Sequence, residues 1–306
     1  MLFYEPLKRP FVSSETWGGN AVRGEGGTGM TIDLSGKVAL VTGGGRGLGR
    51  AMTLALADAG ADVVVAGHIP HDIEPIKHDV SQLGRGRCHA LLADVRKPDN
   101  CDRAVQAAID RFGRLDILIN NAGLGMTLVS PTFTANPPKF WTVTPDAWRS
   151  IMDTNANGPF NMSRAAAPHM IKNGWGRIIN VTTGVETMQQ RGYTPYGPSK
   201  AALEAASCAW AADLDGTGVT VNILVPGGPT DTDMLPGRKG DPNRDGTGRE
   251  ILSPDVMKAP VVWLASNQSD GITAYCFTGR SWDASLPPRD AAERAARPAG
   301  FVERGL

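Results

Sequence analysis

Short apolar runs, rich in β-branched residues, recur along the chain and alternate with longer segments rich in alanine. The apolar runs are residues 38–41, 63–65, 115–119, 178–181 and 219–225. Each run is too short for a helix and too uniformly apolar for a strand with one wet face, so it predicts a strand buried on both faces. The alanine-rich segments show helical spacing and cover residues 48–59, 100–112 and 201–214. This alternation predicts a doubly wound α/β fold built around a parallel sheet.

Three stretches interrupt the alternation and suggest the domain limits. Residues 1–30 are expected to form a Gly-rich N-terminal extension, and a single folded domain is expected over residues 31–284. Residues 124–143 and 227–252 are polar or proline-bearing, and loops of this length inside a compact domain are usually functional or disordered. The Ala/Arg/Pro-rich residues 285–306 are expected to form a surface tail.

Charge and composition exclude several classes of protein. The 306 residues carry 31 basic and 31 acidic groups, so no net charge favours nucleic acid or an acidic membrane. No apolar run approaches a membrane span, and the N-terminus lacks the pattern of a secretory signal. The four cysteines form no C-x-x-C pair, and the histidines at 68, 71 and 78 lack a metal-binding frame. We expect a soluble, cytoplasmic protein without a metal, disulfide, membrane or nucleic-acid partner.

A glycine-rich segment follows the first predicted strand and opens the first predicted helix. Glycines here let the backbone turn tightly and approach a pyrophosphate, whose charge then lies at a helix N-terminus. A glycine loop alone is weak in a chain with 37 glycines, but the strand–loop–helix context favours dinucleotide binding over a plain turn. The candidate contacts in this segment are Gly43, Arg46, Gly47, Leu48 and Gly49.

Further motifs follow the glycine loop in a fixed order. They are Asp94, Asn120-Asn121-Ala122-Gly123, Asn155-Ala-Asn-Gly158, Thr183, Tyr196-Gly-Pro-Ser-Lys200 and Pro226-Gly227. With the T-G-x-x-x-G-x-G spacing of the loop, these motifs resemble the short-chain dehydrogenase/reductase family over roughly residues 31–283. The resemblance implies a Rossmann fold with a seven-stranded parallel sheet, a nicotinamide cofactor, and hydride transfer to or from an alcohol or carbonyl. It also implies a homodimer or homotetramer, with helices near 144–171 and 198–215 in the interface.

The resemblance assigns a set of cofactor-binding residues. They are Gly43, Arg46, Gly47, Leu48, Gly49, His68, Asp94, Val95, Asn121, Gly123, Tyr196, Lys200, Pro226 and Gly227. NAD-binding members carry an acidic residue at the end of the second strand, where this chain has Gly67. Arg46 and His68 are candidates to contact a 2′-phosphate, so we favour NADP over NAD. The alternative is a permissive pocket in which Arg46 is merely solvated.

Tyr196 and Lys200 are candidates for proton transfer. Four residues apart on a helix, their side chains share one face. A phenol has a pKa near 10, and a neighbouring ammonium lowers that pKa, which makes the phenol a usable acid or base. Pro198 places the pair in the first helical turn. Tyr193 is a rival base, but the position four residues after it is glycine, so it is set aside.

Thr183 and Asn155 complete the catalytic set that the resemblance implies. Thr183 lies thirteen residues before Tyr196, where the family usually has serine, and its hydroxyl would orient the substrate carbonyl. Thr182 is a second candidate for that role. Asn155 would hold a water that links Lys200 to solvent; otherwise it is a helix-interior asparagine bonded to its own backbone.

Two departures from the family pattern occur late in the chain. Pro229 removes a backbone N–H near the expected nicotinamide carboxamide, and Asp283-Ala-Ser stands where the family has D-G-G.

The long loops suggest a partly hydrophobic substrate. Their larger apolar side chains are Phe133, Phe140, Trp141, Met234 and Leu235. The sequence therefore predicts an NAD(P)-dependent oxidoreductase, with a catalytically silent NAD(P)-sensing protein on the same fold as the alternative.

Overall fold

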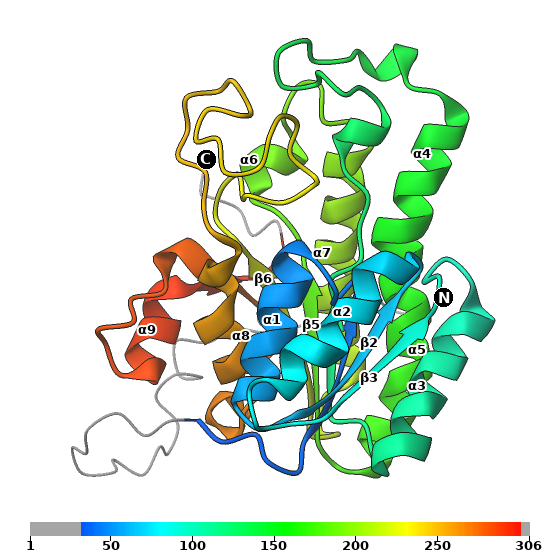
Figure 1. The fold of residues 1–306 in the computed structure, drawn as a ribbon, viewed down its shortest axis with the longest axis vertical. Helices are drawn as coiled ribbons and strands as arrows, with labels where there is room; N and C mark the ends of the chain where they lie inside the picture. The colour runs from blue at the N-terminus through cyan, green and yellow to red at the C-terminus, as the bar shows by residue number, and fades with distance from the viewer. Residues whose placement is uncertain (1–31, 301–306) are drawn as a thin grey trace, which may run out of the picture.

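The computed structural model describes residues 32–300, which form one α/β domain around a central sheet (Figure 1). The sheet has the order β3-β2-β1-β4-β5-β6-β7-β8. Its strands are β1 (Val38–Thr42), β2 (Asp62–Gly67), β3 (Cys88–Leu92), β4 (Ile117–Asn120), β5 (Gly176–Val181), β6 (Val219–Val225), β7 (Tyr275–Thr278) and β8 (Ala296–Pro298). The first seven strands are parallel, and β8 pairs antiparallel with β7. The doubly wound Rossmann architecture is confirmed, with one strand more than expected.

Helices cover both faces of the sheet. They are α1 (Gly47–Asp58), α2 (Pro70–Ser81), α3 (Pro98–Phe112), α4 (Pro145–Met152), α5 (Gly158–Lys172), α6 (Val185–Met188), α7 (Tyr196–Asp213), α8 (Lys258–Leu264) and α9 (Pro288–Ala295). One core cluster joins α1, α2, α8 and α9 to one face, and a second joins α3, α5 and α7 to the other.

Four of the five predicted apolar runs lie wholly in strands, and the run 115–119 lies in β4 from residue 117 onward; apolar residues of these runs alternate between the two cores. On β1, for example, Ala39 and Val41 belong to one cluster while Val38 and Leu40 belong to the other. Burial on both faces explains why these runs read as continuously apolar. The strand order reverses between β1 and β4, which leaves a crevice at their carboxyl ends.

The C-terminal segment corrects one expectation. Residues 285–306 were expected to form a surface tail, but α9 and β8 are integral to the fold. The alanines buried by α9 are Ala291, Ala292 and Ala295. β8 pairs with β7 through Phe277 and Ala296, and Arg297 Nη1 donates to Glu204 Oε1 at 2.8 Å. The segment packs because its alanines fall on one face of a helix, a pattern that its Arg- and Pro-rich composition obscures.

Asp283, the departure from the family's D-G-G, lies in the turn that leads to α9. Its Oδ1 accepts from the backbone N of Ser285 at 3.1 Å, and its Oδ2 accepts from Arg294 Nη1 at 3.1 Å. This aspartate therefore fixes the connection between the core and the C-terminal helix.

Three further expectations concern the N-terminal extension, metal or disulfide sites, and membrane-spanning segments. The Gly-rich extension predicted for residues 1–30 lies outside the described residues. Within residues 32–300, no cluster of His, Cys, Asp and Glu is suited to a metal ion, and the four cysteines are free. None of the helices in this same range has the length and apolar character needed to span a bilayer.

Candidate active site

A cleft of about 1490 Å³ lies at the carboxyl ends of the central strands. Its walls come from the glycine loop after β1, the loop after β4, the start of α7, and residues 227–252. The long loops 124–143 and 227–252 both rise above this edge of the sheet (Figure 1). All predicted cofactor-binding residues line the cleft, and so does Thr183. Asn155 is the exception, because it is buried behind the wall.

The glycine loop forms a cradle that side chains would fill. Gly43 and Gly47 have positive φ angles of 62° and 54°. A Cβ added to Gly49 would lie 2.1 Å from the carbonyl oxygen of Gly43, so the loop is closed too tightly for any other residue. Arg46, which precedes α1, has extended backbone angles and makes no side-chain cap. The first N–H groups of α1 therefore have no capping side chain, which fits a bound pyrophosphate.

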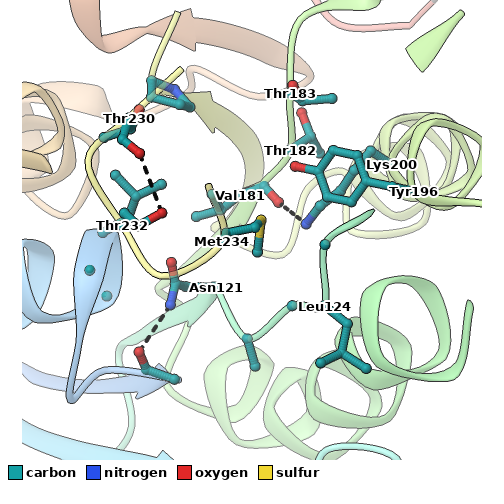
Figure 2. A pocket seen from close by; sticks show the side chains of 18 of the residues that line it. Asn121, Leu124, Val181, Thr182, Thr183, Tyr196, Lys200, Thr230, Thr232 and Met234 are labelled. Atoms are coloured by element: carbon teal, nitrogen blue, oxygen red, sulfur yellow. Dashed lines mark hydrogen bonds between the residues drawn. The ribbon is translucent and has the colours of Figure 1, made fainter. Parts of the chain in front are cut away.

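Asn121 and Thr42 lock this cradle to the next strand. Asn121 Nδ2 donates to the carbonyl oxygens of Thr42 at 2.9 Å and Gly43 at 3.2 Å (Figure 2). In return, Thr42 Oγ1 accepts from the backbone N of Asn121 and of Ala122, both at 3.0 Å. The loops after β1 and β4 thus share one hydrogen-bond network at the point where the strand order reverses.

Where the glycine loop meets α2 and the loop after β3, the cleft is lined by paired positive and negative side chains. Arg46 Nη1 lies 3.3 Å from Asp72 Oδ2 on α2. Asp94 is paired with Arg96 at 2.7 Å, and the Arg96 guanidinium holds the pKa of Asp94 below its usual value. His68 also lines this end. Asp72 and Arg96 were not foreseen, because neither belongs to a motif.

Tyr196, Lys200 and Thr183 meet on one wall of the cleft (Figure 2). Tyr196 begins α7, and Lys200 follows one turn later on the same face. The Tyr196 side chain lies beside Thr183, whose hydroxyl favours the phenolate. Lys200 is buried, and its Nζ donates to the carbonyl oxygen of Val181 at 2.8 Å.

The pKa of Tyr196 differs from the expectation. Burial raises the pKa of Tyr196 to about 12, although the hydrogen bond from Thr183 opposes the change. Burial also lowers the pKa of Lys200 to about 8. In this arrangement desolvation is the largest influence on the phenol, and it opposes the lowering of the pKa expected from the neighbouring ammonium, whose Nζ donates to Val181. At neutral pH the phenol is protonated and is a proton donor.

Asn155 connects two walls of the site. It lies in a π-helical turn, Asp153–Asn157, between α4 and α5. Its Nδ2 donates to Leu124 O at 2.9 Å and to Ser199 Oγ at 3.0 Å, while its Oδ1 accepts from Leu124 N at 2.8 Å. The side chain does not bond its own helical turn in these contacts, so it holds the loop after β4 against the start of α7.

The loop 227–252 is more ordered by polar contacts than its composition suggests. Pro229 lines the cleft, and its carbonyl oxygen accepts from Leu252 N at 2.8 Å, which joins the two ends of the loop. The guanidinium of Arg244 is buried and donates to the carbonyl oxygens of Leu235 at 2.6 Å and Pro236 at 2.9 Å. It also pairs with Asp231. A buried arginine thus holds together a loop that is rich in glycine, proline and polar residues.

The substrate end of the cleft is partly apolar. Of the five apolar side chains expected there, Phe133, Met234 and Leu235 line the cleft. Phe140 and Trp141 do not, since each is 69% exposed, and their rings pack against each other.

Tyr193 and Arg297 are two polar side chains of this region. Tyr193 meets Phe133 edge to face, with ring centroids 5.5 Å apart, and burial raises its pKa. Arg297 reaches the cleft from β8. Sequence reasoning missed Arg297 because its segment was expected to be peripheral.

Comparisons with known proteins identify the family. The family model described as short chain dehydrogenase matches residues 37–242. The chain is 34% identical over 254 residues to 2-dehydro-3-deoxy-D-gluconate 5-dehydrogenase of Escherichia coli, covering 80% of this chain and 94% of the relative. It is 32% identical over 247 residues to 3-oxoacyl-[acyl-carrier-protein] reductase FabG of Vibrio cholerae, covering 79% and 95%.

Solved structures agree. A putative short-chain alcohol dehydrogenase from Sinorhizobium meliloti 1021 has a TM-score of 0.70 and 30% identity, covering 82% of this chain and 97% of that one. A putative NAD(P)-dependent gluconate 5-dehydrogenase from Beutenbergia cavernae with bound NADP has a TM-score of 0.68 and 27% identity, covering 80% and 95%. The chain therefore belongs to the short-chain dehydrogenase family and is an NAD(P)-dependent oxidoreductase that acts on alcohol and carbonyl groups.

Proposed function

We propose that this protein interconverts a carbonyl compound and its alcohol with NADP(H), using Tyr196 as the general acid and base. The observation that supports this most is the phenol of Tyr196. It lies beside Thr183 and Lys200 on the wall of a cleft that also contains the glycine cradle. The nicotinamide would supply or accept the hydride. Nothing in the structure or the comparisons favours a catalytically silent cofactor sensor.

In the reducing direction, Tyr196 gives its proton to the substrate oxygen. Its raised pKa keeps the phenol protonated at neutral pH, so the donor form is the resting form. Thr183 lies beside the Tyr196 side chain, and its hydroxyl orients the same substrate oxygen. In the oxidising direction, Tyr196 must first lose its proton to become the base.

Lys200 and Asn155 support the tyrosine in different ways. With a pKa lowered to about 8, Lys200 is mainly an ammonium at neutral pH, and its charge favours the phenolate during turnover. By resemblance, it also binds the nicotinamide ribose. Asn155 keeps the loop after β4 in register with α7 through Leu124 and Ser199, and in the proposed relay it backs Lys200.

The glycine cradle and the adjoining loops would hold the rest of the cofactor. The proposed contacts are Gly43, Arg46, Gly47, Leu48, Gly49, His68, Asp94, Val95, Asn121, Gly123, Tyr196, Lys200, Pro226 and Gly227. NADP(H) is favoured because Gly67 offers no carboxylate to the adenine ribose and Arg46 offers a cation from the glycine loop.

Substitution of Arg46 tests this preference. We expect Arg46→Ala to weaken NADPH binding by about tenfold, since a charge-assisted hydrogen bond to phosphate contributes about 1.5–3 kcal/mol. NADH binding should change little. The measurement is the dissociation constant of each cofactor by fluorescence titration. Arg50→Ala is the control, because Arg50 lies on α1 and pairs with Asp79 away from the cleft. Equal binding of NADPH and NADH by the wild type would contradict the preference.

The substrate proposed is a small carbonyl compound or alcohol with an apolar portion. Phe133, Met234 and Leu235 supply the apolar surface near the reactive tyrosine. The two relatives described above are named for substrates of different kinds, an acyl-carrier-protein thioester and a sugar acid, so their names do not select between them. A panel of ketones and secondary alcohols, followed by the absorbance of the reduced nicotinamide, tests the proposal.

We also propose that the protein assembles as a homodimer or homotetramer and works in the cytoplasm. Exposed aromatic side chains support an interface on the helices: Trp148 on α4 is 43% exposed and Phe160 on α5 is 51% exposed. The Phe160 ring lies 6.5 Å from that of Trp210 on α7. Because such exposed groups favour burial against a second copy, we expect light scattering at micromolar concentration to give at least a dimer mass.

A further inference from the structure

An ion pair at the adenosine end of the cleft points to a residue that shapes cofactor choice. Arg46 of the glycine loop lies between two carboxylates, with Nη1 3.3 Å from Asp72 Oδ2 and 3.8 Å from Asp233 Oδ2. The Asp72 side chain is only 17% exposed, whereas that of Arg46 is 48% exposed. The closer and more buried partner of Arg46 is therefore Asp72.

Backbone packing fixes Asp72 in this position. A Cβ added to Gly45 would lie only 1.9 Å from the carbonyl oxygen of Asp72, so the first turn of α2 is pressed directly against the glycine loop. Next to it, a Cβ on Gly67 would lie 2.7 Å from Ile73 Cγ2. These contacts hold the backbone of Asp72 against the glycine loop, and this backbone position places its carboxylate 3.3 Å from Arg46.

The neighbouring lysine and arginine are each paired with a carboxylate of their own. Lys239 pairs with Asp233 at 2.8 Å, and Arg96 pairs with Asp94 at 2.7 Å. The ring of His71 is 83% exposed and lies 3.6 Å from Asp72. The cations of Arg46, Lys239 and Arg96 face an equal number of carboxylates, and His68 also lines this end of the cleft. A dianionic 2′-phosphate would thus meet a cation that is already paired.

We propose that Asp72 is a specificity-determining residue that limits the preference for NADP(H) by competing with the 2′-phosphate for Arg46. This inference rests on the proposed assignment of Arg46 to that phosphate. The carboxylate acts in two ways: it holds the guanidinium, and it repels the incoming phosphate. Both effects are electrostatic, and the Arg46 side chain is partly exposed to solvent. We therefore expect effects of moderate size that weaken as the salt concentration rises.

Binding of the adenosine half of the cofactor tests the inference without any turnover. We expect Asp72→Asn to bind 2′,5′-ADP about three- to tenfold more tightly than the wild type, as measured by calorimetry at low salt. Binding of ADP, which lacks the 2′-phosphate, should stay within about twofold. The gain should shrink at high salt. NADPH and NADH titrations should show the same selectivity.

Asp79→Asn is the matched control. Asp79 lies on the same helix, its Oδ2 is 2.8 Å from Arg50 Nη2, and it does not line the cleft. Asp79→Asn should leave the affinities for 2′,5′-ADP and ADP unchanged. A nonspecific effect of lost negative charge would instead appear in Asp79→Asn as well as in Asp72→Asn. Melting temperatures of all variants establish that they are folded, and Asp72→Ser provides a second removal of the carboxylate.

The outcomes separate this inference from the proposed cofactor preference. If Asp72→Asn and Asp72→Ser tighten 2′,5′-ADP no more than ADP, or no more than Asp79→Asn does, the inference is overturned. A wild type that prefers ADP over 2′,5′-ADP would end the proposed NADP preference, yet a selective gain in Asp72→Asn would still support the role of Asp72. In an Arg46→Ala background the gain should be smaller, because the competition for the guanidinium is gone.

Discussion

Tyr196→Phe should abolish carbonyl reduction while the protein still binds NADPH. The substitution removes only the hydroxyl, which is the proposed proton donor and lies beside Thr183. General acid catalysis contributes roughly 10²–10⁴-fold, so we expect turnover to fall by at least that much. The glycine cradle is untouched, so NADPH affinity should stay within about fivefold, in line with a lost hydrogen bond being worth about 1 kcal/mol to binding. Stopped-flow turnover and fluorescence titration measure the two effects.

Tyr193→Phe is the matched control for this experiment. Tyr193 is three residues away, lines the same cleft and also has a pKa raised by burial, but no lysine follows it at helical spacing. Its hydroxyl should therefore be dispensable for proton transfer. If folded Tyr196→Phe retains the wild-type rate on a confirmed substrate, or if Tyr193→Phe loses activity to the same extent, the proposed role of Tyr196 is wrong.

Lys200→Ala should damage both turnover and cofactor binding. The ammonium is buried and within one helical turn of Tyr196, so its loss removes the charge that favours the phenolate. A pKa effect of about two units corresponds to a loss of about 10²-fold in turnover. Loss of the proposed ribose contact should weaken NADPH binding by about tenfold. The same two assays that serve Tyr196→Phe measure these changes.

Because Lys200 is buried, its truncation also opens a cavity, and folding must be measured separately. Lys200→Met keeps most of the aliphatic stem and removes the charge, so it should lose activity with a smaller drop in melting temperature than Lys200→Ala. If the loss of turnover in Lys200→Ala and Lys200→Met parallels the drop in their melting temperatures, Lys200 has only a packing role. Wild-type affinity for NADPH in folded Lys200→Met would contradict the ribose contact.

Much of the fold follows from the sequence because the strands of a covered parallel sheet must be apolar on both faces. The runs at 38–41 and 219–225 are examples, and both lie within strands that are buried along their whole length. β3 was harder to place from its composition, since Cys88–Leu92 includes His89 and is only partly buried at the edge of the parallel sheet. The C-terminal strand was missed because Ala296–Pro298 carries no apolar pattern and pairs only at one edge.

Some residues of the site can be recognised from the sequence, and others are placed there only by packing between distant segments. The glycines of the cradle and the Tyr196–Lys200 spacing are local features, so each can be recognised within a short stretch of sequence. Asp72 and Arg297 are different, because each reaches the cleft through packing between segments that are distant in sequence. The direction of the Tyr196 pKa also depends on burial, which spacing along a helix does not reveal.

The pH dependence of alcohol oxidation tests the coupling of Tyr196 to Lys200 most directly. Oxidation needs the phenolate, and burial raises the pKa of Tyr196, so the base form is scarce at neutral pH and increases as the pH rises. The account predicts that kcat of the wild type rises with pH to a plateau, and that Lys200→Met shifts this rise to higher pH because the phenolate has lost its neighbouring charge. A pH-independent kcat in the wild type, or a rise at the same pH in Lys200→Met, would contradict it.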